Sequence, residues 1–159
     1  MCRAISILKS RINLELLEKY NLQSRIRQRG DNAGEEIVFE FADRDHDPQL
    51  LVIHEGRMLV CEWGNRGGLT PKLPKTGWCR EESLQAGKWR WLSPEKVVIP
   101  AQFGLEKGIW FSTTEGMEGI VVQDQEDVLH AYMLTRDAST YYQNMTKHDR
   151  MPVLIGEQH

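Results

Sequence analysis

Three side chains of this sequence have types that could together perform nucleophilic chemistry, although they lie far apart in the chain. Cys2 carries a thiol, Glu106 a carboxyl group and His148 an imidazole. A thiol needs a partner that takes its proton, and Glu and His are residue types that move protons near neutral pH. Each residue also has a non-functional interpretation. Cys2 could be an inert small residue, Glu106 a solvated turn residue, and His148 part of a capped helix end that leads into a strand. The three form a site only if the fold brings them together.

The elements that must position these residues are mostly short strands. Apolar runs bounded by turn residues predict strands at 2–8, 37–41, 50–54, 57–63, 97–99, 109–112, 120–123, 130–134 and 151–155. Glu55-Gly56 predicts a hairpin turn. Helical spacing of apolar residues predicts a helix over Leu14–Arg27, ended by Gly30, and a brief helix over Ala138–Met145 with Asp137 as its N-cap. We therefore expect one α+β domain over residues 1–159, dominated by antiparallel strands.

A long segment, residues 64–94, is rich in Gly and Pro and is expected to be irregular. Its three tryptophans, Trp78, Trp89 and Trp91, are interleaved with cationic residues. Such a pattern could stack bases and neutralise phosphates of a single nucleic-acid strand. Tryptophans that anchor a long loop to the core would give the same composition, so both interpretations stay open.

Composition excludes several classes of function. The chain has 159 residues, a formal net charge of −3 and 27% charged residues, so nucleic-acid binding would need a local cationic patch. Its three cysteines lack C-x-x-C spacing, which argues against a zinc site and a disulfide framework. No apolar run approaches the roughly 20 residues of a membrane span. We expect a cytoplasmic protein without metal, cofactor or membrane contact.

Three motifs, taken in order, resemble the SRAP family (SOS response-associated peptidase domain). They are Met1-Cys2-Arg3-Ala4, the segment from Pro100 to Glu106, and the string His148-Asp149-Arg150-Met151-Pro152, which is the most specific. The resemblance implies a strand-rich, barrel-like or two-sheet domain with a cationic groove for single-stranded DNA. It also implies that the initiator Met is removed and that the exposed cysteine captures the aldehyde of an abasic site as a thiazolidine crosslink, which shields the lesion.

Elementary chemistry supports this role for an N-terminal cysteine. Such a residue has an α-amine with a pKa of roughly 8 and a thiol with a pKa of about 8.5. The amine condenses with an aldehyde to an imine, and the thiol closes a five-membered ring on the same carbon, which proximity favours. By resemblance, Glu106 orients the amine and relays its proton, and His148 exchanges protons as the sugar ring opens.

The DNA contacts implied by the resemblance come from arginine and tryptophan. Arg80 aligns with a phosphate-binding Arg of the family, and Arg150 is either structural support or a phosphate ligand. Trp78 and Arg3 complete the expected DNA-binding residues. We expect a monomer that associates with the nucleoid and binds single-stranded DNA containing abasic sites.

The sequence departs from the family pattern at several positions. Arg3 stands where the family has Gly and would narrow the site, and Trp78 replaces an active-site Asn. Gln102-Phe103 and Lys107 replace the usual D-G and Trp around Glu106. The chain ends at His159, where family members continue, so a C-terminally shortened domain is expected.

Two alternatives remain beside the crosslinking hypothesis. The first is a cysteine-dependent peptidase or autopeptidase, a hydrolase with Cys2 as nucleophile and His148 as base. The second is a catalytically degenerate module that binds single-stranded DNA without chemistry, an interpretation favoured by Trp78 in place of Asn.

Overall fold

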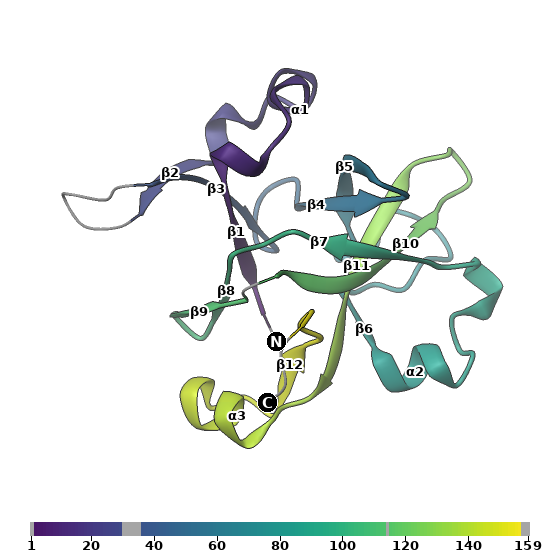
Figure 1. Ribbon diagram of the computed structural model, residues 1–159. Helices are drawn as coiled ribbons and strands as arrows, with labels where there is room; N and C mark the ends of the chain where they lie inside the picture. The colour runs from purple at the N-terminus through teal and green to yellow at the C-terminus, as the bar shows by residue number, and fades with distance from the viewer. Residues whose placement is uncertain (1, 30–35, 114, 157–159) are drawn as a thin grey trace.

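The computed structural model describes residues 2–29, 36–113 and 115–156, which form two sheets and three short α-helices (Figure 1). The first sheet has the strand order β2 (Ile26–Arg29), β3 (Glu36–Ala42), β1 (Ala4–Leu8), β8 (Phe103–Glu106) and β9 (Ile109–Ser112). The second has the order β10 (Met117–Gln123), β7 (Glu95–Ile99), β4 (Gln49–His54), β5 (Arg57–Trp63), β11 (Leu129–Asp137) and β12 (Arg150–Pro152), with β6 (Trp78–Arg80) also paired to β11. β10 pairs with β11 as well, which closes five strands into a barrel. The expected α+β class with mainly antiparallel strands is confirmed.

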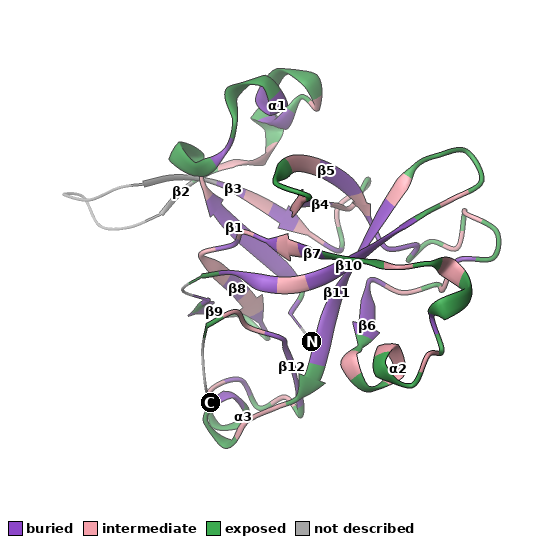
Figure 2. Ribbon diagram, turned by 45° about the vertical axis from the view of Figure 1, so that its right-hand side comes forward, coloured by how far each residue is buried: buried purple, intermediate pink, exposed green. Residues whose placement is uncertain are grey.

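β1 occupies the centre of the first sheet, between β3 and β8. Ile5 lies opposite Phe41 on one side and Gly104 on the other. Both Ile5 and Ile7 are fully buried, and the central strands are the most buried part of the molecule (Figure 2). Because β1 begins at Ala4, this central strand also fixes the position of Cys2 just before it.

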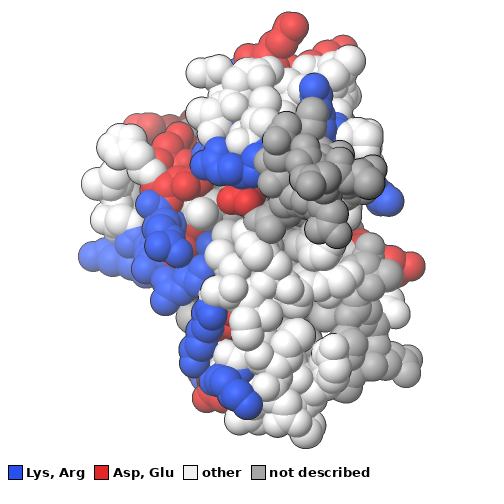
Figure 3. Space-filling model, turned by 90° about the vertical axis from the view of Figure 1, so that its left-hand side faces the viewer, with Lys and Arg blue, Asp and Glu red and all other residues white. Residues whose placement is uncertain are grey.

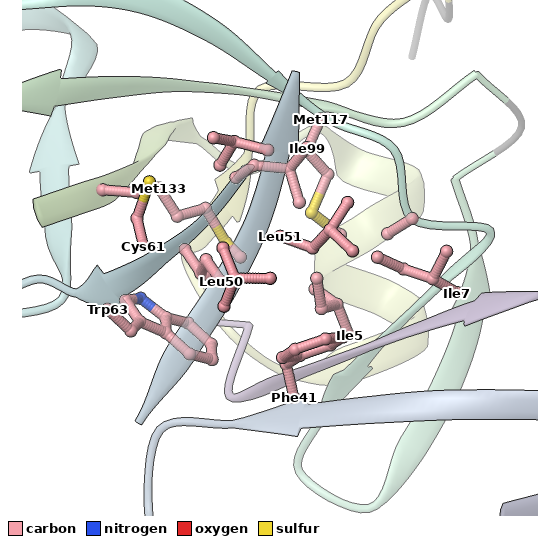
Figure 4. Close-up of a cluster of buried hydrophobic side chains, with 14 of the residues drawn as sticks. Ile5, Ile7, Phe41, Leu50, Leu51, Cys61, Trp63, Ile99, Met117 and Met133 are labelled. Carbon is pink, nitrogen blue, oxygen red and sulfur yellow. The ribbon is translucent and has the colours of Figure 1, made fainter. Parts of the chain in front are cut away.

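The core joins the two sheets. Figure 4 shows Ile5, Ile7 and Phe41 from the first sheet facing the apolar side chains of the second, which are Leu50, Leu51, Ile99, Met117 and Met133. Complete burial of such side chains contributes roughly 1.5–3 kcal/mol each, so this contact is the main source of stability.

The predicted helix over Leu14–Arg27 is wrong in its second half. α1 spans only Leu14–Lys19, and Asn21 has φ 49°, a left-handed conformation that ends it. A 3-10 turn, Leu22–Arg25, and strand β2 follow. β2 pairs with β3, so a long-range backbone partner outweighs the local helical pattern.

Arg25 lies in the 3-10 turn that follows α1 and makes long-range contacts. Its guanidinium donates to Asp45 at 2.5 Å and to Gln49 at 2.8 Å, and it lies 4.9 Å from the centroid of Phe41. Arg25 therefore ties the 3-10 turn to the connection between β3 and β4.

The second predicted helix lies close to its expected place but has a different cap. α3 spans Thr140–Thr146, and the Ser139 hydroxyl accepts from the Tyr142 N–H at 3.1 Å. Asp137 is not the N-cap, because β11 continues through it to pair with Arg150 of β12. α1 and α3 lie at opposite ends of the molecule (Figure 1).

The remaining elements follow the sequence more closely. The Glu55-Gly56 hairpin turn is confirmed, and both residues have positive φ. The segment 64–94 is mostly irregular but contains β6, α2 (Glu81–Gln85) and a 3-10 turn at Arg90–Leu92. The strand β8, which carries Glu106 at its end, was not predicted. Within the described residues, no helix is long and apolar enough to cross a membrane.

The tight packing around Gly104 is testable. A Cβ at this position would lie 2.6 Å from Phe111 Cζ, 2.8 Å from Met117 Cε and 3.0 Å from Cys2 Sγ. We expect Gly104→Ala to lower the free energy of unfolding by about 1–3 kcal/mol, measured by urea denaturation. The matched control is Gly67→Ala, whose Cβ would meet only Leu69 Cγ at 3.8 Å. Equal midpoints for the two variants would show that the packing at Gly104 is loose.

Candidate active site

Cys2 is held from two sides at the start of the central strand. Its side chain is fully buried, and its carbonyl oxygen accepts from Trp78 Nε1 at 3.0 Å. On the other side, the next residue, Arg3, donates its N–H to the Leu105 carbonyl oxygen of β8 at 2.8 Å. The Cys2 thiol donates to the Ala4 carbonyl oxygen at 3.2 Å. The main chain around the candidate nucleophile is therefore well positioned before any substrate arrives.

Burial keeps the Cys2 thiol protonated. It raises the pKa of this thiol to about 12, against the opposing effect of the Leu105 and Ala4 backbone groups, and the Glu106 carboxylate raises it further. A thiol in this environment is not a thiolate nucleophile at neutral pH. Any chemistry at Cys2 must therefore begin with another group or with a proton transfer.

Glu106 and His148 come together beside Cys2. Glu106 ends β8 and is 2% exposed, which contradicts the solvated-turn alternative. Its Oε1 lies 3.8 Å from His148 Nε2. On the other side of the ring, His148 Nδ1 lies 3.0 Å from the backbone nitrogen of Arg150 and 3.2 Å from its carbonyl oxygen, so Nε2 is the ring nitrogen that faces the carboxylate.

The two segments that carry this pair are also linked directly. Lys107 follows Glu106, and its Nζ donates to the carbonyl oxygen of Lys147, the residue before His148, at 2.9 Å. Lys147 has φ 62° and is the C-cap of α3. The bond therefore joins the end of β8 to the end of α3 next to the Glu106–His148 pair.

Trp78 and two arginines form a cationic cluster on the other side of Cys2. Trp78 is 8% exposed and packs against Trp63 with a centroid distance of 5.9 Å. Arg3 Cζ and Arg66 Cζ lie 5.5 and 5.8 Å from the Trp78 ring. Both guanidinium groups pair with the buried carboxylate of Asp43. Arg66 was not singled out from the sequence, because only the fold brings its loop to Trp78.

The other two predicted DNA-binding arginines have different surroundings. Arg150 is 9% exposed and donates to Glu82 at 2.7 Å, Asp137 at 2.8 Å and Thr135 at 3.0 Å. Its hydrogen bond to Glu82 lowers the pKa of that carboxyl group. Of the two roles expected for Arg150, these contacts favour structural support. Arg80 has a side chain that is 65% exposed, and its Nε lies 3.9 Å from Glu82.

A cavity of about 740 Å³ opens beyond Asp43 and Arg66, and acidic residues outnumber arginines in its lining. His130 Nδ1 donates to Gly64 O at 2.8 Å there, and its Nε2 lies 2.8 Å from Asp124 Oδ2. Burial, and next a hydrogen bond with Asp47, raise the pKa of Glu62 to about 7. The many carboxylates make this cavity unfavourable for phosphate groups, in contrast to the Trp78 side.

One group among the described residues could geometrically hold a metal ion, and it is not at Cys2. His54, Glu55 and Glu95 have ligand atoms within 4.8 Å of one another at the β4–β5 turn and the start of β7. His54 Nε2 and Glu95 Oε2 already form an ion pair at 3.2 Å when the histidine is charged. The two glutamates are exposed and His54 is partly buried, and no other feature of the described residues directs a ligand to them.

Comparison with known proteins identifies the fold but no family. No known family model and no curated protein sequence matches this chain. A crystal structure of a Bordetella bronchiseptica protein, solved by the Northeast Structural Genomics Consortium, matches with a TM-score of 0.59. The alignment covers 96% of this chain and 83% of that chain, at 16% sequence identity. This similarity shows the fold alone.

The buried thiols predict low reactivity in the folded chain. Burial raises the pKa values of Cys2, Cys61 and Cys79 to about 12 each. The thiolate fraction at pH 8 is then on the order of 10⁻⁴, against roughly 0.2 for an ordinary thiol. We expect the protein with Met1 retained to react with a disulfide reagent at least about 100-fold more slowly when folded than in concentrated urea.

The raised pKa values of the three thiols also predict how the free energy of unfolding changes with pH. Each thiol binds its proton more tightly in the folded than in the unfolded chain, so the free energy of unfolding should decrease as pH rises from about 8.5 towards 12.

One result would contradict the predicted low reactivity of the thiols. If one thiol of the folded chain reacts rapidly with the disulfide reagent and Cys2→Ala removes that reaction, Cys2 is activated.

Proposed function

We propose that this protein captures abasic sites in single-stranded DNA as a covalent crosslink through Cys2, after Met1 is removed, and so shields the lesion during a DNA-damage response of the SOS type. The observation that carries the proposal is the convergence of Cys2 with the Glu106–His148 pair, from three distant segments of the chain. The resemblance of the motifs to the SRAP family supports it. Each protein molecule would react once and stay attached to the DNA, so the activity is not an ordinary catalytic turnover. Its cysteine chemistry is of the kind found in lyases and peptidases.

The order of the chemical steps follows from the burial of the thiol. With Met1 removed, the Cys2 nitrogen becomes an α-amine with a pKa of roughly 8, so a useful fraction is neutral near pH 7. Burial, which raises the pKa of this thiol to about 12 in the chain with Met1, favours the protonated thiol. The amine is therefore the first nucleophile: its nitrogen adds to the aldehyde carbon, and the resulting carbinolamine loses water to give an imine.

The thiol completes the reaction in a second step. The sulfur bonds to the imine carbon, the C=N π electrons pass to nitrogen, and the thiol proton is transferred to that nitrogen. The product is a thiazolidine, and its closure is intramolecular. In this proposal the Glu106–His148 pair, whose facing atoms are 3.8 Å apart, accepts the proton from the ammonium and gives it to the leaving hydroxyl.

Cationic side chains near Cys2 supply the contacts for the DNA backbone. Arg3 and Arg66 have side chains 48% and 42% exposed, and both are held in place by Asp43. Arg80 is a further exposed cation on the strand that carries Trp78. On the face drawn in Figure 3, Lys and Arg side chains gather along one margin of the molecule. Trp78 itself positions Cys2 through its indole N–H, since its ring is largely covered.

A denaturing gel tests the proposal. The protein is mixed with single-stranded DNA that carries one abasic site, and we expect a covalent band that requires both the lesion and Cys2. Cys2→Ala should form no stable band. Cys2→Ser keeps the amine but not the thiol, so its imine should survive the gel only after borohydride reduction. A version with an uncleaved N-terminal extension should not crosslink, because its Cys2 nitrogen is an amide.

The alternatives are outcomes of the same experiment. DNA retained on a native gel but not on a denaturing gel would contradict the proposal and favour a binding module. Cys2-dependent cleavage of a peptide without DNA association would favour a peptidase. Intact mass shows whether Met1 is present, and full crosslinking by a chain that retains it would overturn the amine mechanism.

The proton-transfer pair makes a separate prediction. We expect Glu106→Gln and His148→Gln each to slow crosslink formation about 100-fold at pH 7, because general acid–base groups typically contribute 10²–10⁴. The matched controls are Glu126→Gln and His46→Gln, which change exposed residues of the same types. Single-turnover rates should leave the controls within about twofold of wild type. Equal rates for all four variants would exclude the pair from the chemistry.

A further inference from the structure

Tyr142 is a large aromatic residue at the interface between α3 and the first sheet. It lies in the first turns of α3, and its side chain is 2% exposed. Its ring packs edge-on against Phe111 of β9, with a centroid distance of 5.2 Å and an interplanar angle of 84°. This packing uses only the ring, so phenylalanine would serve it equally well.

The hydroxyl of Tyr142 is buried without a hydrogen bond of normal geometry to any described residue. Thr146 is near enough to lower the pKa of the phenol somewhat, but it donates its own proton to the Tyr142 carbonyl oxygen at 2.8 Å. The Thr146 oxygen also accepts from the His148 N–H at 3.3 Å. An unsatisfied buried hydroxyl costs about 1–3 kcal/mol, so the phenol lowers stability where phenylalanine would not.

The surroundings of this hydroxyl are those of the Cys2 site. Phe111 contacts the Tyr142 ring, and both Phe111 Cζ and Cys2 Sγ lie within 3.0 Å of the place that a Cβ on Gly104 would take. Burial raises the pKa of Tyr142, and the Glu106 carboxylate and, at very high pH, the Cys2 thiolate raise it further. The phenol therefore stays neutral and keeps its proton throughout the pH range in which an amine condenses with an aldehyde.

We propose that Tyr142 is a further catalytic residue of the Cys2 site, whose hydroxyl donates a hydrogen bond to the aldehyde oxygen of the abasic deoxyribose. This inference rests on the function proposed above. As the Cys2 nitrogen adds to the carbonyl carbon, the C=O π electrons pass to oxygen, and the Tyr142 hydroxyl stabilises the negative charge that develops there. The Glu106–His148 pair then moves both nitrogen protons to this oxygen, the first to give the carbinolamine and the second as the oxygen leaves as water, so that the nitrogen is left as the imine and Tyr142 keeps its own proton.

The proposed role of Tyr142 would also replace the polar group that the sequence lacks at position 78. Trp78 stands where the resemblance places an active-site Asn, and its indole N–H is occupied by the Cys2 carbonyl. Among the described residues, Tyr142 offers a buried donor that is not used within the protein. A preorganised donor in a site without water stabilises a developing oxyanion more strongly than it would in solution.

The test compares Tyr142→Phe with a matched control. Ser6 also has a buried hydroxyl without a hydrogen-bond partner among the described residues, but it lies within β1 between Glu40 and Phe103. Ser6→Ala therefore removes the same kind of unsatisfied group with no expected role in chemistry. Both variants are compared with wild type for urea midpoint, native binding to single-stranded DNA and single-turnover rate of crosslinking to an abasic site.

We expect both variants to be as stable as wild type or more stable, and both to bind DNA normally. Tyr142→Phe should crosslink about 100-fold more slowly, in line with the loss of one oxyanion donor, whereas Ser6→Ala should crosslink at the wild-type rate. A Tyr142→Phe protein that crosslinks at the wild-type rate overturns this inference and leaves the proposed function intact. A lower urea midpoint for Tyr142→Phe also overturns it, because the hydroxyl would then be a structural hydrogen-bond donor. A wild-type protein that forms no crosslink refutes the proposed function itself.

Discussion

The rest of the structure depends on the pairing of β1 between β3 and β8. This pairing buries Ile5 and Ile7 against the second sheet, and it also brings Cys2 beside Leu105 and Glu106. The Trp78 indole then holds the Cys2 carbonyl from the opposite side. One set of backbone hydrogen bonds therefore supports both the core and the candidate site. A change that shifts β1 along β8 would move Cys2 away from Glu106 and His148 as well as disturb the core.

Burial determines how such a site can react. A thiol exposed to water would ionise readily near pH 8.5, but the Cys2 thiol is protonated far above that value because its surroundings cannot solvate a thiolate. The same apolar environment keeps Tyr142 neutral. In the proposed reaction, the buried site therefore favours an amine that reacts first and a thiol that reacts second. It also favours hydrogen-bond donors that keep their protons. Low polarity strengthens those donors and excludes water that would compete for the aldehyde.

The sequence predicted elements well wherever local pattern and long-range pairing agreed. The Glu55-Gly56 turn and the strands on either side of it could be identified because a two-residue turn between two short apolar runs forms a local unit. The helix over Leu14–Arg27 was overestimated because β2 gains its stability from β3, a partner that local spacing does not reveal. Asp137 was misassigned as a cap for the same reason, since β12 extends β11 through it. β8 was missed because its four residues, which include Gly104, carry too weak a local pattern.

The sequence by itself determined the α+β class and the identity of three chemical groups, Cys2, Glu106 and His148, because residue type decides which protons a side chain can hold. Only the tertiary structure decided that Glu106 lies buried beside His148, that Trp78 holds Cys2 instead of offering an open ring, and that Arg150 pairs with Glu82. It also decided that Tyr142 and Arg66 belong to the neighbourhood of Cys2. These facts depend on contacts between segments dozens of residues apart, and distance along the chain gives no measure of distance in the fold. Burial, which sets the proton affinity of Cys2, arises in the same way from side chains that only the folded core assembles.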